Sequence, residues 1–353
     1  MPEHQKLAGL SVKTSNLCSE ITLPTGIDKF DMQRTAVCCL SSLNLEKYEE
    51  WENHPTFIDD VMRFLDNALQ DFIDSAPDDF KNAVYSAMRE RSVGLGVMGF
   101  HSFLQKKSIP WEGVMAKVWN KRIFKHIREE ADASSVDLAA ERGACPDAAD
   151  LGVQERFSNK MAIAPTASIS IICGGTSAGI EPIAANSFTH KTLSGSFNVK
   201  NTALKRLLAE RGHDTDETWS SITKYEGSVQ HLDFLNELEK EVFKTAFEID
   251  QRWIIELGGD RAPYICQSQS INLFLPADIH KRDLHQLHFQ AWKQGMKSLY
   301  YCRSKSLQRS ESIASTGPAD GVAALPLLGK VNGGEQPAAP LNTNDYEECL
   351  SCQ

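Results

Sequence analysis

The feature that most constrains the fold is an alternation between short strand-like runs and long segments with helical periodicity. Apolar residues recur at the three-and-four spacing of amphipathic helices over residues 56–75, 79–91, 112–142, 228–257 and 282–297. Runs rich in β-branched and apolar residues lie between them, at 35–45, 267–275 and 297–303. Strands that alternate with long helices predict an α/β architecture with parallel strands.

Composition and charge exclude several classes of protein. The chain has 353 residues, 41% of them hydrophobic, which is enough for a sizeable core in one large domain or two. Its formal net charge of −10 argues against a nucleic-acid-binding surface. No apolar run reaches the ~18 residues of a membrane span, and the first residues lack the layout of a secretory signal. We therefore expect a cytoplasmic protein that binds neither nucleic acid nor membrane.

Nine cysteines are dispersed along the chain, at positions 18, 38, 39, 145, 173, 266, 302, 349 and 352. This odd, scattered set is not typical of a secreted disulfide framework. A zinc site needs two cysteine pairs, or one pair with histidines at ligand spacing. Cys349 and Cys352 have such spacing, but no second half follows them. The cysteines therefore predict redox or catalytic use rather than a metal site.

The densest chemistry lies at residues 15–25, where Asn16, Cys18 and Glu20 alternate. In an extended or tightly looped backbone the period of two places these side chains on one side. A hydrogen-bonding amide, a sulfur capable of one-electron chemistry and a general base would then converge on one small ligand. The alternative is an ordinary strand whose cysteine is a small buried hydrophobe. The local pattern leaves both interpretations open.

Two further motifs allow a functional and a structural interpretation. Gly94, Gly96 and Gly99 match the dinucleotide fingerprint formally, but a charged helical segment precedes them instead of a strand. These glycines are better explained by close approach of helices and strands. A short apolar strand at 161–164 runs into a turn at 165–170, whose small hydroxylated residues could hold phosphate oxygens. The alternative for that turn is a polar connection without a ligand.

The last part of the chain, from about residue 316, is dominated by glycine, alanine and proline and predicts a flexible tail. It ends in the pair Cys349 and Cys352. A dithiol on such a tether can visit a buried site and then a soluble reductant. The alternative is a disordered end with incidental cysteines.

Together these features resemble the catalytic large (alpha) subunit of class I ribonucleotide reductase. The matching segments are 15–25, 36–45, 91–99, 164–182, 267–275, 299–303 and the terminal Cys-x-x-Cys. The resemblance implies the C-terminal half of a ten-stranded α/β barrel, with a catalytic finger loop near 15–25. It divides the chain into a barrel portion at 1–315 and a redox tail at 316–353.

The resemblance also implies an activity, the reduction of ribonucleoside diphosphates to 2′-deoxyribonucleoside diphosphates for DNA precursor synthesis. Cys18 matches the thiyl-radical cysteine that removes the 3′-hydrogen. Glu20 matches the base for the 3′-hydroxyl proton, and Asn16 matches the amide that binds the substrate hydroxyls. Cys38 matches the reducing cysteine that forms a disulfide at each turnover. Cys39, which would face the opposite way on a strand, is expected to pack in the core.

Further residues follow from the same resemblance. Tyr300 and Tyr301 look like the pair that relays the radical between the subunit surface and Cys18. Cys349 and Cys352 resemble the pair that re-reduces the site and is itself reduced by thioredoxin or glutaredoxin. The expected substrate-binding residues are Asn16, Leu17, Cys18, Ser19, Glu20, Pro165, Thr166, Ala167, Ser168 and Ile169.

The family's remaining parts imply partners rather than cofactors bound to this chain. A dinuclear metal and radical cofactor is expected in a small (beta) subunit. The disulfide partner of Cys38 and the ATP and dNTP effector sites are expected in an N-terminal part of the alpha subunit that this sequence lacks. We therefore expect an oligomer that needs an N-terminal companion. The alternatives are an adenosylcobalamin-dependent reductase, against which the Tyr300–Tyr301 pair argues, or an inactive fragment that binds only the small subunit.

Overall fold

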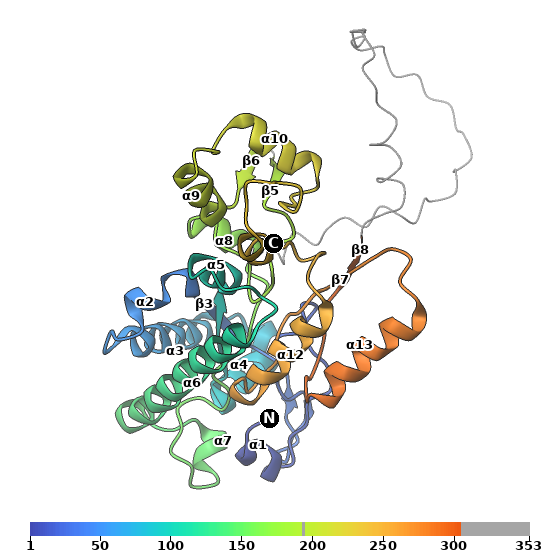
Figure 1. The fold of residues 1–353 in the computed structure, drawn as a ribbon. Helices are drawn as coiled ribbons and strands as arrows, with labels where there is room; N and C mark the ends of the chain where they lie inside the picture. The colour runs from blue at the N-terminus through green and yellow to red at the C-terminus, as the bar shows by residue number, and fades with distance from the viewer. Residues whose placement is uncertain (193–194, 305–353) are drawn as a thin grey trace, which may run out of the picture.

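A computed structural model of the chain describes residues 1–192 and 195–304 (Figure 1). The predicted tail at 316–353, with Cys349 and Cys352, lies outside the described residues.

The first part of the chain contains α1 (Glu3–Leu7), β1 (Gly26–Ile27), β2 (Gln33–Arg34), β3 (Cys39–Asn44), α2 (Tyr48–Trp51), α3 (Phe57–Ser75), α4 (Lys81–Glu90), β4 (Val93–Met98), α5 (Phe100–Lys106), α6 (Val114–Arg142) and α7 (Pro146–Ala149). The second part contains α8 (Ala167–Ile172), β5 (Ser187–Thr192), β6 (Gly195–Lys200), α9 (Thr202–Glu210), α10 (Asp216–Lys224), α11 (Glu237–Val242), α12 (Gln251–Arg261), β7 (Leu273–Leu275), α13 (Lys281–Lys293) and β8 (Cys302–Ser304).

A row of parallel backbone segments forms the centre of the molecule. β3 pairs with β4 in parallel, from Cys39 opposite Val93 to Asn44 opposite Met98. Parallel bridges then join β4 to residues 161–163 and these to Gln269, and β7 pairs in parallel with β8. These contacts confirm the predicted α/β class with parallel strands. The pairings among the described residues form a row and do not close a barrel.

Helices cover this row. α3 and α6 pack side by side, and Figure 1 shows them along the lower left of the molecule. The buried face of α3 carries Ile58, Met62, Leu65 and Leu69 at helical spacing. Buried residues of α3, α6, β3, β4 and α12 form the main hydrophobic core. The predicted helices at 56–75, 79–91, 112–142 and 282–297 correspond to α3, α4, α6 and α13, so these predictions are confirmed.

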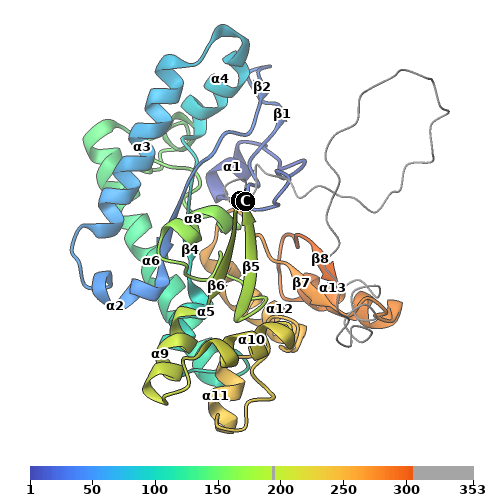
Figure 2. The ribbon, with the colours of Figure 1, turned by 90° about the horizontal axis from the view of Figure 1, so that it is seen from above.

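A second, smaller core lies among elements that the periodicity did not predict. The antiparallel pair β5–β6 is followed by α9 and α10, and Figure 2 shows these elements gathered together with α11. Leu204, Trp219, Ile222 and Phe243 are among the buried residues of this core. Residues from 203–243 therefore form a hydrophobic core of their own, separate from the main hydrophobic core.

The prediction of one long helix over 228–257 is wrong. The structure has two helices there, α11 and α12, joined through turns. Asn236 forms a capping box with Glu239, and the Asp250 side chain accepts a hydrogen bond from the Arg252 amide, so each helix has its own N-terminal cap. Gly258 and Gly259 do not end the helix as predicted, because α12 continues to Arg261.

The strands predicted at 267–275 and 297–303 are shorter in the structure, because regular pairing is confined to β7 and β8. Their predicted positions are confirmed, but most of each segment holds its place through single hydrogen bonds. Tyr300 donates its amide to the carbonyl of Ile271 at 2.8 Å, and Gln267 donates to that of Met161 at 3.1 Å.

The glycines at 94–99 act as spacers. Gly94 and Gly96 lie inside β4, where an added Cβ on Gly94 would lie 3.1 Å from the Cys38 sulfur. On Gly96 it would lie 2.4 Å from the carbonyl oxygen of Ala162, a distance that no side chain tolerates. This confirms the interpretation of the motif as close packing.

A buried carboxylate joins α3 to the segments around it. Asp66 lies in α3, is 1% exposed, and bonds Arg91 at 2.6 Å, Arg142 at 2.9 Å and Arg156 at 3.0 Å. Burial opposes ionisation of this group, but hydrogen bonds from Arg156 and Arg91 hold the pKa of Asp66 below its ordinary value. One carboxylate thus compensates three guanidinium groups.

We expect Asp66→Ala to lower the free energy of unfolding by about 3–5 kcal/mol, because it leaves buried arginines without their counter-charge. Urea denaturation checks this value. Asp71→Ala, an exposed position on the same helix, should change the free energy by less than about 0.5 kcal/mol. Equal small effects at both positions would contradict the role given to Asp66.

Candidate active site

The loop that carries the alternating motif is a tight turn, not a strand. Ser19 has a positive φ of 65°, and its amide donates to the carbonyl of Asn16 at 3.1 Å. The side-chain oxygen of Asn16 accepts a hydrogen bond from the backbone amide of Ile21 at 3.0 Å. The Asn16 side chain therefore closes the loop on itself. The ordinary strand that the sequence left open is wrong, and the backbone is the tight loop that the other interpretation allowed.

The loop presents its residues unequally. Cys18 and Glu20 are buried, with 4% and 3% exposure, whereas Leu17 is 62% exposed. Ser19 is buried and accepts a hydrogen bond from Ser298 at its carbonyl oxygen, at 3.0 Å. The sulfur and the carboxylate therefore point into the molecule, as chemistry in a shielded site requires.

One serine holds both of these residues. The Ser270 hydroxyl contacts the carbonyl oxygen of Cys18 and lies 3.1 Å from Oε2 of Glu20. The amide of Ser268 donates to the carbonyl of Glu20 at 2.9 Å. Segment 267–272 thus supports the loop through alternate residues, 250 positions away in the sequence.

A pair of tyrosines leads away from the buried sulfur. The Sγ of Cys18 and the hydroxyl oxygen of Tyr300 lie 3.4 Å apart. The rings of Tyr300 and Tyr301 have centroids 4.0 Å apart and planes inclined by 34°. Tyr301 is 42% exposed, so the three residues form a continuous path from a buried sulfur to the surface of the described chain.

A half-buried carboxylate, Glu181, supports this pair through Asn272, and the sequence did not single it out. The amide of Tyr301 donates to Oδ1 of Asn272 at 3.0 Å. Asn272 donates to Glu181 through its own amide at 2.6 Å and its side chain at 3.0 Å. Burial raises the pKa of Glu181 to about 7, against the lowering effect of the hydrogen bonds from Asn272. Neither residue belongs to a local motif, so only the fold brings them together.

Cys38 and Cys39 face different surroundings, as predicted for adjacent residues at the start of a strand. The Sγ of Cys38 lies 3.3 Å from the side-chain nitrogen of Gln267. Cys39 instead packs against the main hydrophobic core. Burial raises the pKa of the Cys38 thiol well above its ordinary value, and the hydrogen bond from Gln267 acts in the opposite direction.

The predicted phosphate turn is only partly a turn. Pro165 and Thr166 leave the parallel row, Thr166 has a positive φ of 56°, and the next residues form α8. The Thr166 hydroxyl accepts from the amide of Gly179 at 2.7 Å. Gly179 stands two residues before Glu181, so one short segment connects this turn to the support of the tyrosine pair.

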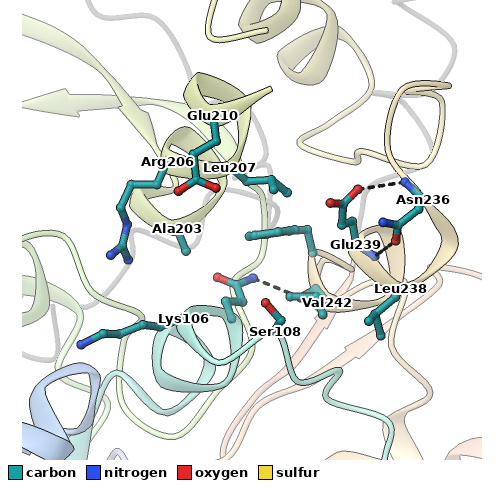
Figure 3. A pocket seen from close by; sticks show the side chains of 12 residues that line it. Lys106, Ser108, Ala203, Arg206, Leu207, Glu210, Asn236, Leu238, Glu239 and Val242 are labelled. Atoms are coloured by element: carbon teal, nitrogen blue, oxygen red, sulfur yellow. Dashed lines mark hydrogen bonds between the residues drawn. The ribbon is translucent and has the colours of Figure 1, made fainter. Parts of the chain in front are cut away.

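A pocket of about 290 Å³ lies between α5, α9 and α11 and is lined in part by Lys106, Arg206 and Glu239 (Figure 3). Its lining includes none of the residues of the Cys18 loop, the tyrosine pair or the turn at 165–170, so it is not part of the candidate active site.

Two absences hold for the described residues only. Within residues 1–192 and 195–304, no three His, Cys, Asp or Glu side chains are grouped as metal ligands. Nor does this part of the chain contain a helix that is both long and apolar enough to cross a membrane.

Comparison with known proteins points to one family. The family model for the ribonucleotide reductase barrel domain matches residues 3–150 and 148–302. The ribonucleoside-diphosphate reductase large subunit of Invertebrate iridescent virus 6 is 52% identical over 302 residues, which cover 84% of this chain and 31% of that protein. The putative large subunit of Frog virus 3 is 43% identical, covering 99% of this chain and 56% of that protein.

A solved structure agrees. The alpha subunit of the Actinobacillus ureae class Id ribonucleotide reductase superposes with a TM-score of 0.79 at 37% identity, covering 89% of this chain and 57% of that one. The sequence and structure comparisons therefore agree on one family. The chain belongs to the ribonucleotide reductase family and matches its barrel domain. It spans 31% to 56% of the length of the two viral relatives.

Ser270→Ala should loosen the loop that carries Cys18. The variant removes the single hydroxyl hydrogen that a buried carboxylate and a carbonyl share, at a cost of about 1–2 kcal/mol. Amide exchange in residues 16–22 should then become about 5–30 times faster. Ser187→Ala, which removes a buried hydroxyl bonded to Thr223 beside the second core, should leave that exchange unchanged. Unchanged exchange in both variants would contradict the supporting role of Ser270.

Glu181 should make stability depend on pH. Its pKa is about 7 in the folded chain and ~4.3 when unfolded, so its contribution is fully present below the unfolded value. This contribution is lost as pH rises through about 7. The measurement is the free energy of unfolding at pH 5 and at pH 8. Between these two pH values, Glu181→Gln should lose less stability than the unmodified chain. Equal losses would show that Glu181 does not titrate in this range.

Proposed function

We propose that this chain is the barrel portion of a class I ribonucleotide reductase alpha subunit. A complete alpha subunit that contains it would reduce ribonucleoside diphosphates to 2′-deoxyribonucleoside diphosphates. The observation that carries the proposal is the 3.4 Å approach of the Tyr300 hydroxyl to the buried sulfur of Cys18, with the ring of Tyr301 centred 4.0 Å from that of Tyr300. A sulfur that only packs in a core needs no such path to the surface.

In the proposed reaction Cys18 acts as a thiyl radical. It removes the hydrogen atom from C3′ while Glu20 takes the proton of the 3′-hydroxyl. One of two thiols protonates the 2′-hydroxyl, which leaves as water, and a hydrogen from the thiol pair is delivered to C2′. The two thiols have then supplied two electrons and become a disulfide. Glu20 returns its proton to the 3′-oxygen, and Cys18 returns the hydrogen atom to C3′. Cys38 is one of these two thiols, and the other belongs to a part of the alpha subunit outside this sequence.

Substrate is held around the same loop. We assign the binding of the ribose to residues 16–20, with the side-chain nitrogen of Asn16 available because its oxygen closes the turn. Residues 165–169 would hold the diphosphate. The positive φ of Thr166 supports this assignment, because it turns the chain sharply at the end of the parallel row.

The proposal implies several partners. The small subunit supplies the oxidising equivalent from its dinuclear metal and radical cofactor, and Tyr300 and Tyr301 pass it inward. Cys349 and Cys352 would re-reduce the disulfide, with thioredoxin or glutaredoxin as the donor. ATP and dNTP effectors would bind the N-terminal part of the complete subunit, which we expect to be an oligomer.

The test is reduction of CDP by a complete alpha subunit that includes this chain, assayed with a metal-loaded small subunit and thioredoxin. Cys18→Ser should abolish turnover, because an alkoxyl oxygen cannot take over the reversible hydrogen transfer of sulfur. Cys39→Ser, a matched change at a core-facing cysteine, should retain most of the activity.

Equal loss in both variants would show that the cysteines are misassigned. Absence of any CDP reduction by the assembled, unmodified enzyme would favour a chain that only binds the small subunit. Turnover supported by adenosylcobalamin without the small subunit would contradict the class I assignment.

A further inference from the structure

We infer that Gln267 is a positioning residue that holds the Cys18 loop and the Cys38 sulfur in one arrangement and stabilises the thiolate of Cys38. The assignment of Cys18 and Cys38 to a reaction rests on the proposed function. The contacts of Gln267 do not depend on it.

The buried amide of Gln267 contacts three separate segments. Its side-chain oxygen accepts from the amide of Thr22 at 3.2 Å, four residues after Cys18. Its side-chain nitrogen donates to the carbonyl of Val93 at 3.0 Å and lies 3.3 Å from the Sγ of Cys38. Gln267 is 1% exposed, so water does not compete for these contacts.

The orientation of this amide is determined by its partners. A backbone amide can only donate and a backbone carbonyl can only accept, so Thr22 requires the oxygen of Gln267 and Val93 requires its nitrogen. The nitrogen carries two hydrogens. With one directed to Val93, the other is available to the sulfur of Cys38, and a flipped amide would break both backbone contacts.

The backbone of Gln267 is equally fixed. The backbone amide of Gln267 donates a hydrogen bond to the carbonyl of Met161 at 3.1 Å within the parallel row. The side chain therefore extends from a rigid base, and the distance between the Thr22 amide and the Cys38 sulfur is set by the length of one amide group. A shift of either segment would leave a buried polar group without its partner.

The contact has a chemical consequence for Cys38. A hydrogen bond to the charged form of a group favours that form, so the amide of Gln267 stabilises the thiolate over the thiol. Thiol–disulfide exchange and alkylation both proceed through the thiolate. Gln267 should therefore increase the reactivity of a cysteine that burial otherwise suppresses. Cys39 packs against the main core instead and serves as an internal reference.

The experiment compares alkylation rates of Cys38 and Cys39 by mass spectrometry in the full chain, using iodoacetamide at a pH below both pKa values. Gln267→Glu replaces the donor with an acceptor and should raise the pKa of Cys38 by about one unit or more, which slows its alkylation about tenfold. Gln267→Met removes the donor without adding charge and should slow it by a smaller factor. Cys39 should react at the same rate in all three chains.

Gln269→Glu is the matched control. Gln269 is buried in the same segment, but it bonds Arg261 at 2.6 Å and the carbonyl of Gly258 at 3.0 Å. This variant should leave the rate of Cys38 unchanged. Near-ultraviolet circular dichroism verifies that each variant is folded.

The positioning role has its own measurement, because Gln267→Met also removes the acceptor of the Thr22 amide. Amide exchange of Thr22 should become faster, while that of the β5–β6 strands should not change. Cys38 rates within twofold of the unmodified chain in both folded variants would overturn the inference. So would failure of both variants to fold when Gln269→Glu folds, since the amide would then be a purely structural element. Neither readout involves nucleotide reduction, so failure of the inference and failure of the proposed function are distinguishable.

Discussion

The site depends on one segment, residues 267–272, which lies between the cysteine loop and the tyrosine pair. Its side chains bond the loop through Gln267 and Ser270, and its backbone bonds Tyr300 through the carbonyl of Ile271. The segment is itself held in the parallel row by Met161. Because hydrogen bonds fix each of these contacts, the separation between the Cys18 sulfur and the Tyr300 hydroxyl follows from the register of the row.

Such an arrangement is costly to disturb. The residues of this segment are mostly polar and yet buried, with Gln267, Ser268, Ser270 and Asn272 each at most 4% exposed. Each buried polar group must keep its partner, because an unpaired one costs about 1–3 kcal/mol. The network therefore holds the Cys18 loop and the tyrosine pair in one arrangement. A reaction that passes between Tyr300 and Cys18 requires such a fixed distance. The Asp66 cluster performs a similar task further out, where it joins α3 to its neighbours by charge.

The sequence predicted the parts of this structure that local patterns determine. Helical periodicity located α3, α4, α6 and α13, and the glycines of β4 indicated close packing. The prediction failed at 228–257, where the caps at Asn236 and Asp250 divide the segment, because apolar spacing alone does not show where one helix ends and the next begins. The second core was missed since its elements are short, with nine residues each in α9 and α10.

The candidate site likewise contains residues that a local motif identifies and residues that only the fold brings together. Asn16, Cys18 and Glu20 form a local motif, and the sequence identified them, although it did not decide between strand and turn. Their supports were not identified, because residues such as Glu181 acquire a role only when the fold places them beside a distant partner. Gln267 was noted only as part of a strand-like run, and its amide became informative once its three partners were known.

Under the proposed function, Tyr300 delivers a radical to the sulfur of Cys18 across their 3.4 Å contact. This step can be tested by measuring CDP reduction by the complete enzyme with Tyr300→Phe, which keeps the ring and removes only the hydroxyl. Turnover should fall to background while the variant remains folded and still binds the small subunit. Turnover close to that of the unmodified enzyme would contradict radical transfer through Tyr300.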